Sequence, residues 1–327
     1  MKNYHRIEKV FYAQPWAIVP AKLYEIAHFL RIKASGDDIK QAELTLIQEQ
    51  ARILESRREA AAQATARSGG MVAVLPVYGT ISHRASLMTE MSGGTSLQKL
   101  TGQFRQAAND PQVKAIVLEF DSPGGSVDGV EELANEIFQA RGSKKIVAVA
   151  NTWADSAAYY LASAAEEIVV TPSGEVGSIG VWMMHADFSK QLESDGIKVT
   201  LVSAGKYKTA GNPYEPLSDY ALAALQSEVN VFYEMFVKAV ARARGVSAAE
   251  VRGGFGEGRA VTATEAVKLG IADRVATLDQ TLERLGVSRG ILKSGRAEEP
   301  AREIEPEKPE WNARLEMRRR QLRQHGH

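Results

Sequence analysis

The chain has no cysteine among its 327 residues. Disulfide bonds, zinc sites built on thiolates and a cysteine nucleophile are therefore excluded, and the composition suits a reducing cytosol. The chain also has no net charge, because 40 lysines and arginines balance 40 aspartates and glutamates. No overall basic field favours nucleic acid or an anionic membrane as a partner.

Long uninterrupted apolar runs are also missing. A helix that crosses a bilayer needs about 20 apolar residues. The nearest candidate, residues 11–30, is interrupted by five residues: Pro15, Pro20, Lys22, Glu25 and His28. It also lacks the unbroken apolar centre of a signal peptide. We therefore expect a soluble protein that works in the cytoplasm.

From Met71 onward, apolar strand patterns alternate with helical patterns. Strands are predicted at residues 71–78, 113–120, 145–150 and 167–171, and helices at 96–109, 127–141 and 156–165. Strands separated by helices of this length indicate βαβ units and a parallel sheet. The chain is therefore predicted to be an α/β protein. A Gly-rich strand at 175–184, a second strand at 197–203 and a long helix at 218–244 follow.

The two ends of the chain have a different composition. Residues 1–70 predict a helical extension, with an amphipathic helix before residue 34 and a charged, Ala-rich helix at 37–67. The second helix either packs on its own domain or wraps a neighbouring subunit. Residues 71–287 form the expected α/β domain. Residues 288–327 are rich in Glu, Lys, Arg and Pro and predict a flexible tail, whose basic end is either solvated or contacts proteins or nucleic acid.

Ser156 lies in the stretch around which we expect the domain to be organised, IVAVANTWADSAAYYLAS at residues 146–163. A buried strand runs through a short turn into an Ala-rich helix, and the serine stands where the helix begins. The first turn of a helix presents unpaired N–H groups to a site where negative charge develops. An ordinary helix cap is the alternative interpretation.

Two other loops carry residues suited to the same chemistry. Gly124 and Gly125 follow an apolar strand in IVLEFDSPGGSV, and paired glycines let backbone N–H groups face a ligand, as an oxyanion hole requires. A plain tight turn would look the same. Lys206 and Lys208 follow the predicted strand at 197–203 in a Gly-rich loop, where most lysines are solvated.

The three pieces together resemble the signal peptide peptidase A family, including its phage branch of capsid-maturation proteases. The resemblance rests on the order strand–GG–helix, strand–DS–helix and GKYK, with the second lysine 52 residues after the serine. It covers residues 71–285. It implies a Clp protease/crotonase-like fold, a Ser156/Lys208 catalytic dyad and a ring-shaped homo-oligomer. Ser178 matches a serine that the family places beside its dyad.

The base that activates Ser156 has three candidates in the sequence. Lys206 and Lys208 lie on the same face of an extended KYK segment, so only the resemblance favours Lys208. Either lysine must be neutral near pH 7, and burial would lower its pKa. His185, 29 residues after the serine, is the third candidate and would complete a Ser/His/Asp triad.

The predicted reaction is hydrolysis of a peptide bond through an acyl-enzyme. Ser156 attacks the carbonyl, Lys208 takes the proton, and the N–H groups of Gly125 and Ala157, with Gly124 beside them, stabilise the oxyanion. No metal or other cofactor is needed. The substrate is expected to bind as an added strand, with residues 181–183 lining a specificity pocket or simply belonging to the core.

The expected substrates are capsid scaffold, coat or portal proteins of a phage or prophage, since no membrane anchor is evident. A soluble peptidase that degrades signal peptides or other proteins is the alternative within the family. Outside it, a crotonase-like enzyme acting on acyl-CoA thioesters and a non-catalytic capsid assembly protein are the rivals. A crotonase would not need the Ser–Lys pair, and intact Ser156 and Lys208 argue against an assembly role.

Overall fold

The computed structural model describes residues 14–35, 41–84 and 93–287. Its helices are α2 (Pro20–Ser35), α3 (Gln41–Arg67), α5 (Leu97–Asn109), α6 (Val130–Ala140), α7 (Ala157–Ser163), α8 (Ser189–Ser194), α9 (Asp219–Arg244), α10 (Ala248–Gly254), α11 (Ala263–Lys268) and α12 (Leu278–Arg284). Its strands are β1 (Trp16–Ile18), β2 (Val72–Tyr78), β3 (Ile81–Ser82), β4 (Thr95–Ser96), β5 (Ala115–Ser122), β6 (Gly124–Ser126), β7 (Lys145–Asp155), β8 (Glu167–Val170), β9 (Glu175–Gly177), β10 (Ala260–Thr262) and β11 (Arg274–Val275). The tail expected at 288–327 lies outside the described residues.

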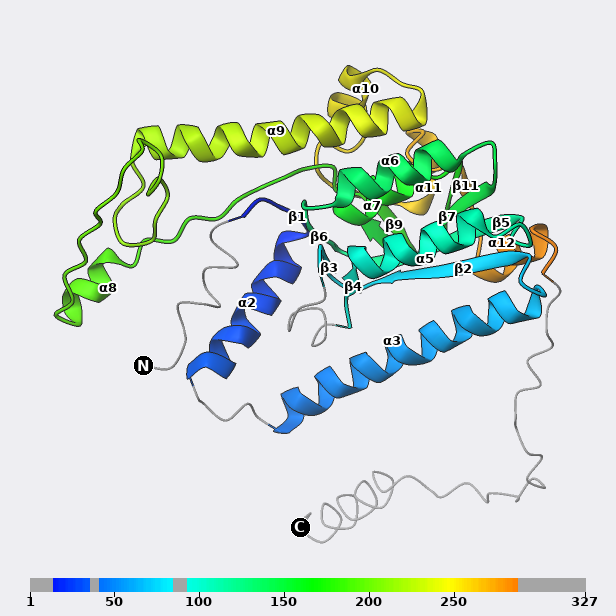
Figure 1. Cartoon of the computed structure of the whole chain (residues 1–327), viewed down its shortest axis with the longest axis horizontal. Helices are drawn as coiled ribbons and strands as arrows, with labels where there is room; N and C mark the ends of the chain where they lie inside the picture. Colours follow the sequence, from blue (N-terminus) through cyan, green and yellow to red (C-terminus); the bar gives the residue numbers. More distant parts are fainter. Residues whose placement is uncertain (1–13, 36–40, 85–92, 288–327) are drawn as a thin grey trace, which may run out of the picture. The chain divides into compact units, whose positions relative to one another are not determined.

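The larger sheet has β5 and β7 at its centre, and Figure 1 shows the helices α5, α6 and α7 near them. Along the main path the strand order is β10-β9-β7-β5-β2, while β8 joins β7 to β11. Every pairing in this sheet is parallel except β10 with β9. The predicted α/β class with a parallel sheet is therefore confirmed.

The central strands are buried on both faces, which explains their nearly continuous apolar sequence. On β7, Ile146, Ala148 and Ala150 contribute to one apolar cluster. Val147 and Val149 contribute to another on the opposite face. This alternation follows from the two-residue period of a strand.

A second, smaller sheet lies beside the carboxyl end of β5. Its order is β1-β6-β3-β4, and β6 is the strand that contains the Gly-Gly pair. β1 comes from the N-terminal extension and pairs antiparallel with β6. The sequence did not predict β1, because three residues are too few to show a periodic pattern.

The end of α3 packs on the chain's own domain rather than projecting from it. Ala61 and Ala64 are buried in the cluster that contains Val72 and Val74 of β2. Arg57 donates a hydrogen bond to the buried carboxylate of Glu119 at 3.2 Å and forms an ion pair with Asp121. For this part of the helix, the expectation that it packs on its own domain is confirmed.

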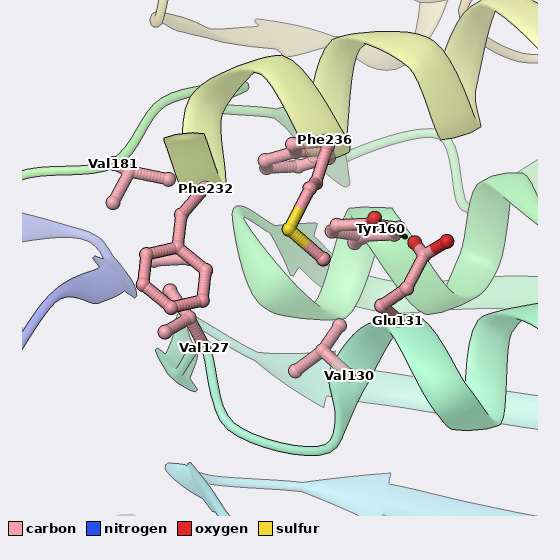
Figure 2. Close-up of a pocket in the computed structure, with 9 residues that line it drawn as sticks. Val127, Val130, Glu131, Tyr160, Val181, Phe232 and Phe236 are labelled. Carbon is pink, nitrogen blue, oxygen red and sulfur yellow. Dashed lines mark hydrogen bonds between the residues drawn. The ribbon is translucent and has the colours of Figure 1, made fainter. Parts of the chain in front are cut away.

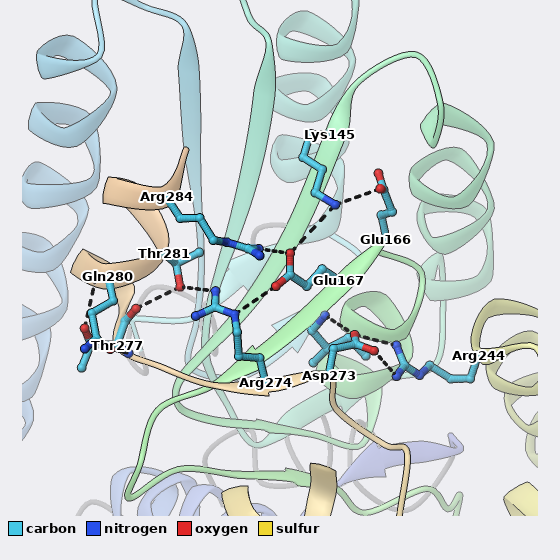
Figure 3. Close-up of polar contacts among 11 residues, drawn as sticks. Lys145, Glu166, Glu167, Arg244, Asp273, Arg274, Thr277, Gln280, Thr281 and Arg284 are labelled. Carbon is cyan, nitrogen blue, oxygen red and sulfur yellow. Dashed lines mark hydrogen bonds and ion pairs between the residues drawn. The ribbon is translucent and has the colours of Figure 1, made fainter. Parts of the chain in front are cut away.

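Ion pairs attach the last described elements to β8. Figure 3 shows the guanidinium groups of Arg274 and Arg284 converging on the carboxylate of Glu167. Asp273 accepts hydrogen bonds from the amide of Ile168 at 2.7 Å and from Arg244 at the end of α9. These contacts close the domain at β11 and α12.

The prediction of a strand at 197–203 is wrong, because this segment forms no strand in the structure. Its side chains are exposed, Val202 by 94%, and a strand without a neighbour leaves its backbone groups unpaired. The Gly-rich strand expected at 175–184 is shorter, since only β9 at 175–177 has strand structure. Within the described residues, no helix is long and apolar enough to cross a membrane.

Candidate active site

Ser156 stands between the end of β7 and the start of α7. Two extra residues in β7 shift its register against β5, so that Phe120 pairs with Ala150 but Ser122 pairs with Ala154. Beyond this bulge the backbone of Ser156 has φ 56° and ψ −119°, a conformation rare for a residue with a side chain. Such strain persists where the surrounding structure enforces it, often at functional sites.

The contacts of Ser156 argue against the simple cap. Its amide donates to the Gly177 carbonyl at 2.8 Å, and its own carbonyl accepts from the Tyr160 amide at 2.9 Å. Its hydroxyl makes no capping hydrogen bond to α7 and instead faces the Gly180 carbonyl at 3.4 Å. The residue is 1% exposed. Ser156 is therefore held by its backbone, and its hydroxyl has only one long polar contact.

Gly124 and Gly125 both lie where a side chain would not fit. Gly124 has φ 96°, and a Cβ there would overlap the Ala17 carbonyl oxygen and lie 3.0 Å from the Ala157 amide nitrogen. A Cβ on Gly125 would overlap the backbone of Ile81. The structure thus brings the predicted oxyanion residues together: the Gly-Gly strand approaches the first amide of α7.

Asp155, directly before Ser156, is a buried carboxylic acid. Its side chain is 0% exposed, and neither carboxylate oxygen has a hydrogen-bond partner among the described residues. Desolvation raises its pKa to about 7, and the negative charge of Glu175 contributes in the same direction. In the sequence, Asp155 stands out only as part of the strand–DS–helix motif.

Lys208 is exposed and lies far from Ser156 of the same chain. Its neighbour Tyr207 contacts the ring of Tyr220, in the first turn of α9, at 6.1 Å between centroids. Sixteen residues further along α9, Phe236 stacks on Tyr160, one turn after the serine. At 1.5 Å per residue, the two contacts are separated by about 24 Å. Figure 1 shows α9 running this course.

The described part of one chain therefore does not assemble the predicted dyad. Lys206 shares the exposed loop, with its ammonium 5.1 Å from the Tyr207 ring. Nε2 of His185 bonds to the Asn212 carbonyl at 2.9 Å. Ser178 has φ 51°, and its amide donates to the Arg259 carbonyl. No hydrogen bond in the described residues joins any of these side chains to Ser156.

An apolar pocket opens beside the Gly-Gly strand and α7. Figure 2 labels most of its lining: Val127, Val130, Glu131, Tyr160, Val181, Phe232 and Phe236. Ala17 and Met235 also line it. The Tyr160 hydroxyl donates to the Glu131 carboxylate, so the polar groups at its edge satisfy one another. Burial, and then this hydrogen bond, raise the pKa of Tyr160. Val181 belongs to this lining, whereas Trp182 and Met183 do not.

Residues 139–291 match peptidase family S49. The matched segment is just under half of the chain. The resemblance expected from the motifs is confirmed, and the S49 segment contains Ser156, both lysines of the GKYK loop, Ser178 and every described element after α6.

Two viral relatives extend the similarity beyond the S49 segment. "Capsid assembly protease C" of Escherichia phage lambda is 35% identical over 69% of this chain and 52% of its own length. "Head-tail preconnector protein GP5" of Enterobacteria phage P21 is 35% identical over 62% of this chain and 40% of its own length. The chain thus spans about half the length of the relatives it matches.

A solved structure of a ClpP1 variant from Listeria monocytogenes is also similar. It covers 64% of this chain and 94% of its own, with 16% identity and a TM-score of 0.40. The α/β class is assigned from the sheet itself and not from this likeness.

Proposed function

We propose that the chain is a serine endopeptidase in which Ser156 is the nucleophile. The observation that carries this proposal is the backbone of Ser156: it is held at φ 56° between a bulged strand and a helix, with its hydroxyl uncapped and the Gly124–Gly125 strand close by. The match to a peptidase family supports the same reaction.

The proposed base is Lys208, supplied by a second copy of the chain. The roughly 24 Å between the Tyr207 and Tyr160 contacts along α9 is more than a lysine side chain can reach. A neighbouring copy can place its exposed GKYK loop over Ser156 without changing either fold. Enclosure at such an interface would remove Lys208 from water, which lowers the pKa of an ammonium and favours the neutral amine.

The chemistry follows from these positions. As the Ser156 oxygen bonds to the substrate carbonyl carbon, its proton passes to the neutral amine of Lys208. The amides of Gly125 and Ala157 stabilise the oxyanion. The C–N bond then breaks, and the leaving amine takes the proton back. Water, deprotonated by the same lysine, hydrolyses the ester and restores the serine. This route uses no metal or other cofactor.

Polypeptides of a phage or prophage capsid are the proposed substrates. Support comes from the two viral relatives, one of them named a capsid assembly protease. Scaffold, coat and portal proteins are the candidates, and the host cytoplasm or the assembling capsid is the proposed setting. A homo-oligomer is required if the base crosses between copies.

The test compares the purified protein with Ser156→Ala, Lys208→Ala and His185→Ala variants on casein and on a candidate coat or scaffold protein. We expect cleavage by the unchanged protein and by His185→Ala, and none by the other two. A folded but inert His185→Ala variant, with an active Lys208→Ala variant, would transfer the role of base to the histidine.

A mixing experiment tests the proposed origin of the lysine. Neither Ser156→Ala nor Lys208→Ala alone has a complete dyad. Co-refolded at equal amounts, they form mixed interfaces, of which about a quarter pair an intact serine with an intact lysine in a head-to-tail assembly. Recovery of about a quarter of the activity is expected. No recovery from demonstrably mixed oligomers would place both residues in one chain.

A further inference from the structure

The N-terminal strand β1 lies between two segments of the candidate active site. On one side it pairs antiparallel with β6, Trp16 opposite Ser126 and Ile18 opposite Gly124. On the other side the Trp16 amide donates to the Trp182 carbonyl at 2.9 Å, and the Trp182 amide donates to the Trp16 carbonyl at 3.0 Å. These three residues thus form a strand that fills the groove between β6 and the Trp182 segment.

Side-chain contacts hold the same strand. The indole N–H of Trp182 donates to the Ile18 carbonyl at 3.0 Å. Trp16, Ala17 and Ile18 are each 2% exposed or less. β1 is therefore completely enclosed, although it belongs to an extension that is far in sequence from the strands on either side of it.

The register turns Ala17 toward the oxyanion amides. The Val19 amide donates to the Pro123 carbonyl at 2.9 Å, and hydrogen-bonded pairs recur every second residue in an antiparallel ladder. Ala17 therefore faces Gly125 with its N–H and C=O. Its carbonyl oxygen also lies beside Gly124 on the side of the Ala157 amide. These are the amides that stabilise the oxyanion in the proposed reaction.

Ala17 is among the residues that line the apolar pocket, together with Val130, Tyr160 and Phe232. A methyl group is the smallest side chain that this position can present. β1 thus has the three features of a bound substrate: extended backbone, a carbonyl at the catalytic amides and a side chain in a pocket.

We propose that the groove between β6 and Trp182 binds substrate polypeptides and that β1 is its intramolecular occupant, competing with them for the site. This inference rests on the proposed peptidase function for its consequence, though not for the binding itself. The substrate runs antiparallel to β6, with an apolar residue at the place of Ala17. Hydrolysis of another polypeptide then requires β1 to leave the groove.

The tether makes this competition strong. A segment joined to its site by a short linker acts at an effective concentration on the order of mM. If the free β1 segment bound the empty groove with a Kd of about 10–100 µM, a competing substrate would therefore bind the full chain about 10- to 100-fold more weakly. Release of β1, by a partner or by removal of the N-terminal residues, would raise activity without any change at Ser156.

Binding is tested first, in chains that carry Ser156→Ala and cut nothing. The probe is a fluorescein-labelled peptide with the sequence of residues 11–21, followed by fluorescence anisotropy. In the full chain Ala17→Asp places a charge in the apolar pocket and should release β1, so we expect the labelled peptide to bind at least 10-fold more tightly. Glu25→Gln, on the exposed side of α2, is the matched control and should change nothing.

A chain that begins at Val19 provides the second variant. It should bind the labelled peptide as tightly as the Ala17→Asp chain, and a peptide that itself carries Ala17→Asp should not bind. Equal binding to the unchanged and the shortened chain, or no binding to a shortened chain whose circular dichroism and melting are native, would overturn the inference.

Activity separates this inference from the proposed function. With Ser156 intact, we expect the shortened chain to hydrolyse casein with a KM at least 10-fold lower than the full chain and a similar kcat. Identical kcat/KM values in the two chains would show that β1 does not compete for the groove, and the proposed peptidase function would be unaffected. Tight peptide binding by a shortened chain that hydrolyses nothing would support the groove as a binding site and contradict the peptidase function.

Discussion

The ring of Tyr160 stacks on the ring of Phe236, with 4.5 Å between their centroids and 11° between their planes. This contact ties α7, the helix that follows Ser156, to the middle of α9. Phe236 is completely buried, and both rings line the pocket beside β1. The helix that carries the exposed lysine loop at one end is thus attached to the serine site further along its length.

Loss of the Tyr160–Phe236 contact should weaken the packing of α7 on α9. Phe236→Ala removes a buried ring and is expected to lower the free energy of unfolding by about 3–5 kcal/mol. Urea denaturation followed by circular dichroism measures the change. Phe232→Ala, in the same pocket but partly exposed, should cost clearly less; an equal loss for both would contradict a special role for the stacked pair.

The buried acid beside the serine predicts a pH dependence of stability. The pKa of Asp155 is raised from 3.8 to about 7 in the folded chain, so the folded state keeps a proton that the unfolded state has lost. Stability should therefore fall as pH rises from about 4 to about 7, by at most about 1.4 kcal/mol per pH unit. Asp155→Asn should remove this slope in urea melts performed across the range.

Asp187 provides a control of opposite sign. It is exposed, and hydrogen bonds from the side chain and then the backbone of Ser189 lower its pKa. Its contribution is present above the unfolded pKa and is lost as pH falls through the folded value. Asp187→Asn should leave the decline between pH 4 and pH 7 intact. If Asp155→Asn also leaves it intact, the cause lies in another group.

The two glycines of β6 should resist even the smallest substitution. Gly124→Ala would force a Cβ into the Ala17 carbonyl at a φ of 96°, and Gly125→Ala would force one into Ile81. We expect each to abolish casein hydrolysis and to lower the melting temperature. Gly102→Ala is the matched control, since a Cβ there meets nothing within 4 Å inside α5. It should stabilise the chain by about 0.5–1 kcal/mol.

Loss of Arg57 should detach the end of α3 from the sheet. Its guanidinium pairs with Glu119, whose side chain is 4% exposed, and with Asp121. Arg57→Ala leaves these carboxylates near each other without their cation, and we expect a loss of about 3 kcal/mol of unfolding free energy. Arg105→Ala breaks the exposed pair with Glu136 and should change little. Equal effects would mean that burial of Glu119 is unimportant.

The sequence was sufficient to predict the scaffold of the site. Apolar runs such as AIVLEF and IVAVA, separated by helical patterns, indicate parallel strands buried on both faces, and the loops that follow β5 and β7 then meet at one edge of the sheet. Gly124, Gly125 and Ser156 are brought together for this reason. The bulge at the end of β7 could not be predicted from the residue pattern, because Asn151 and Thr152 fit an ordinary turn as well as a bulged strand.

The rest depended on contacts between distant segments. Nothing local in PWAIVP indicates that Trp16 will pair with Trp182, 166 residues later. Residues 197–203 are rich in β-branched side chains, but β propensity needs a neighbouring strand to act, and in the described part of the chain this segment pairs with none. The position of Lys208 relative to Ser156 could not be predicted once that strand was absent.

The length of α9 has a consequence for how a polypeptide would be divided. If each nucleophile is completed by the lysine of the next copy, successive serines along the assembly are about 24 Å apart, the span between the Tyr207 and Tyr160 contacts. An extended chain advances about 3.4 Å per residue. Two neighbouring serines could then act on one threaded polypeptide at points about seven residues apart, and the helix would act as a ruler that fixes the size of the released peptides.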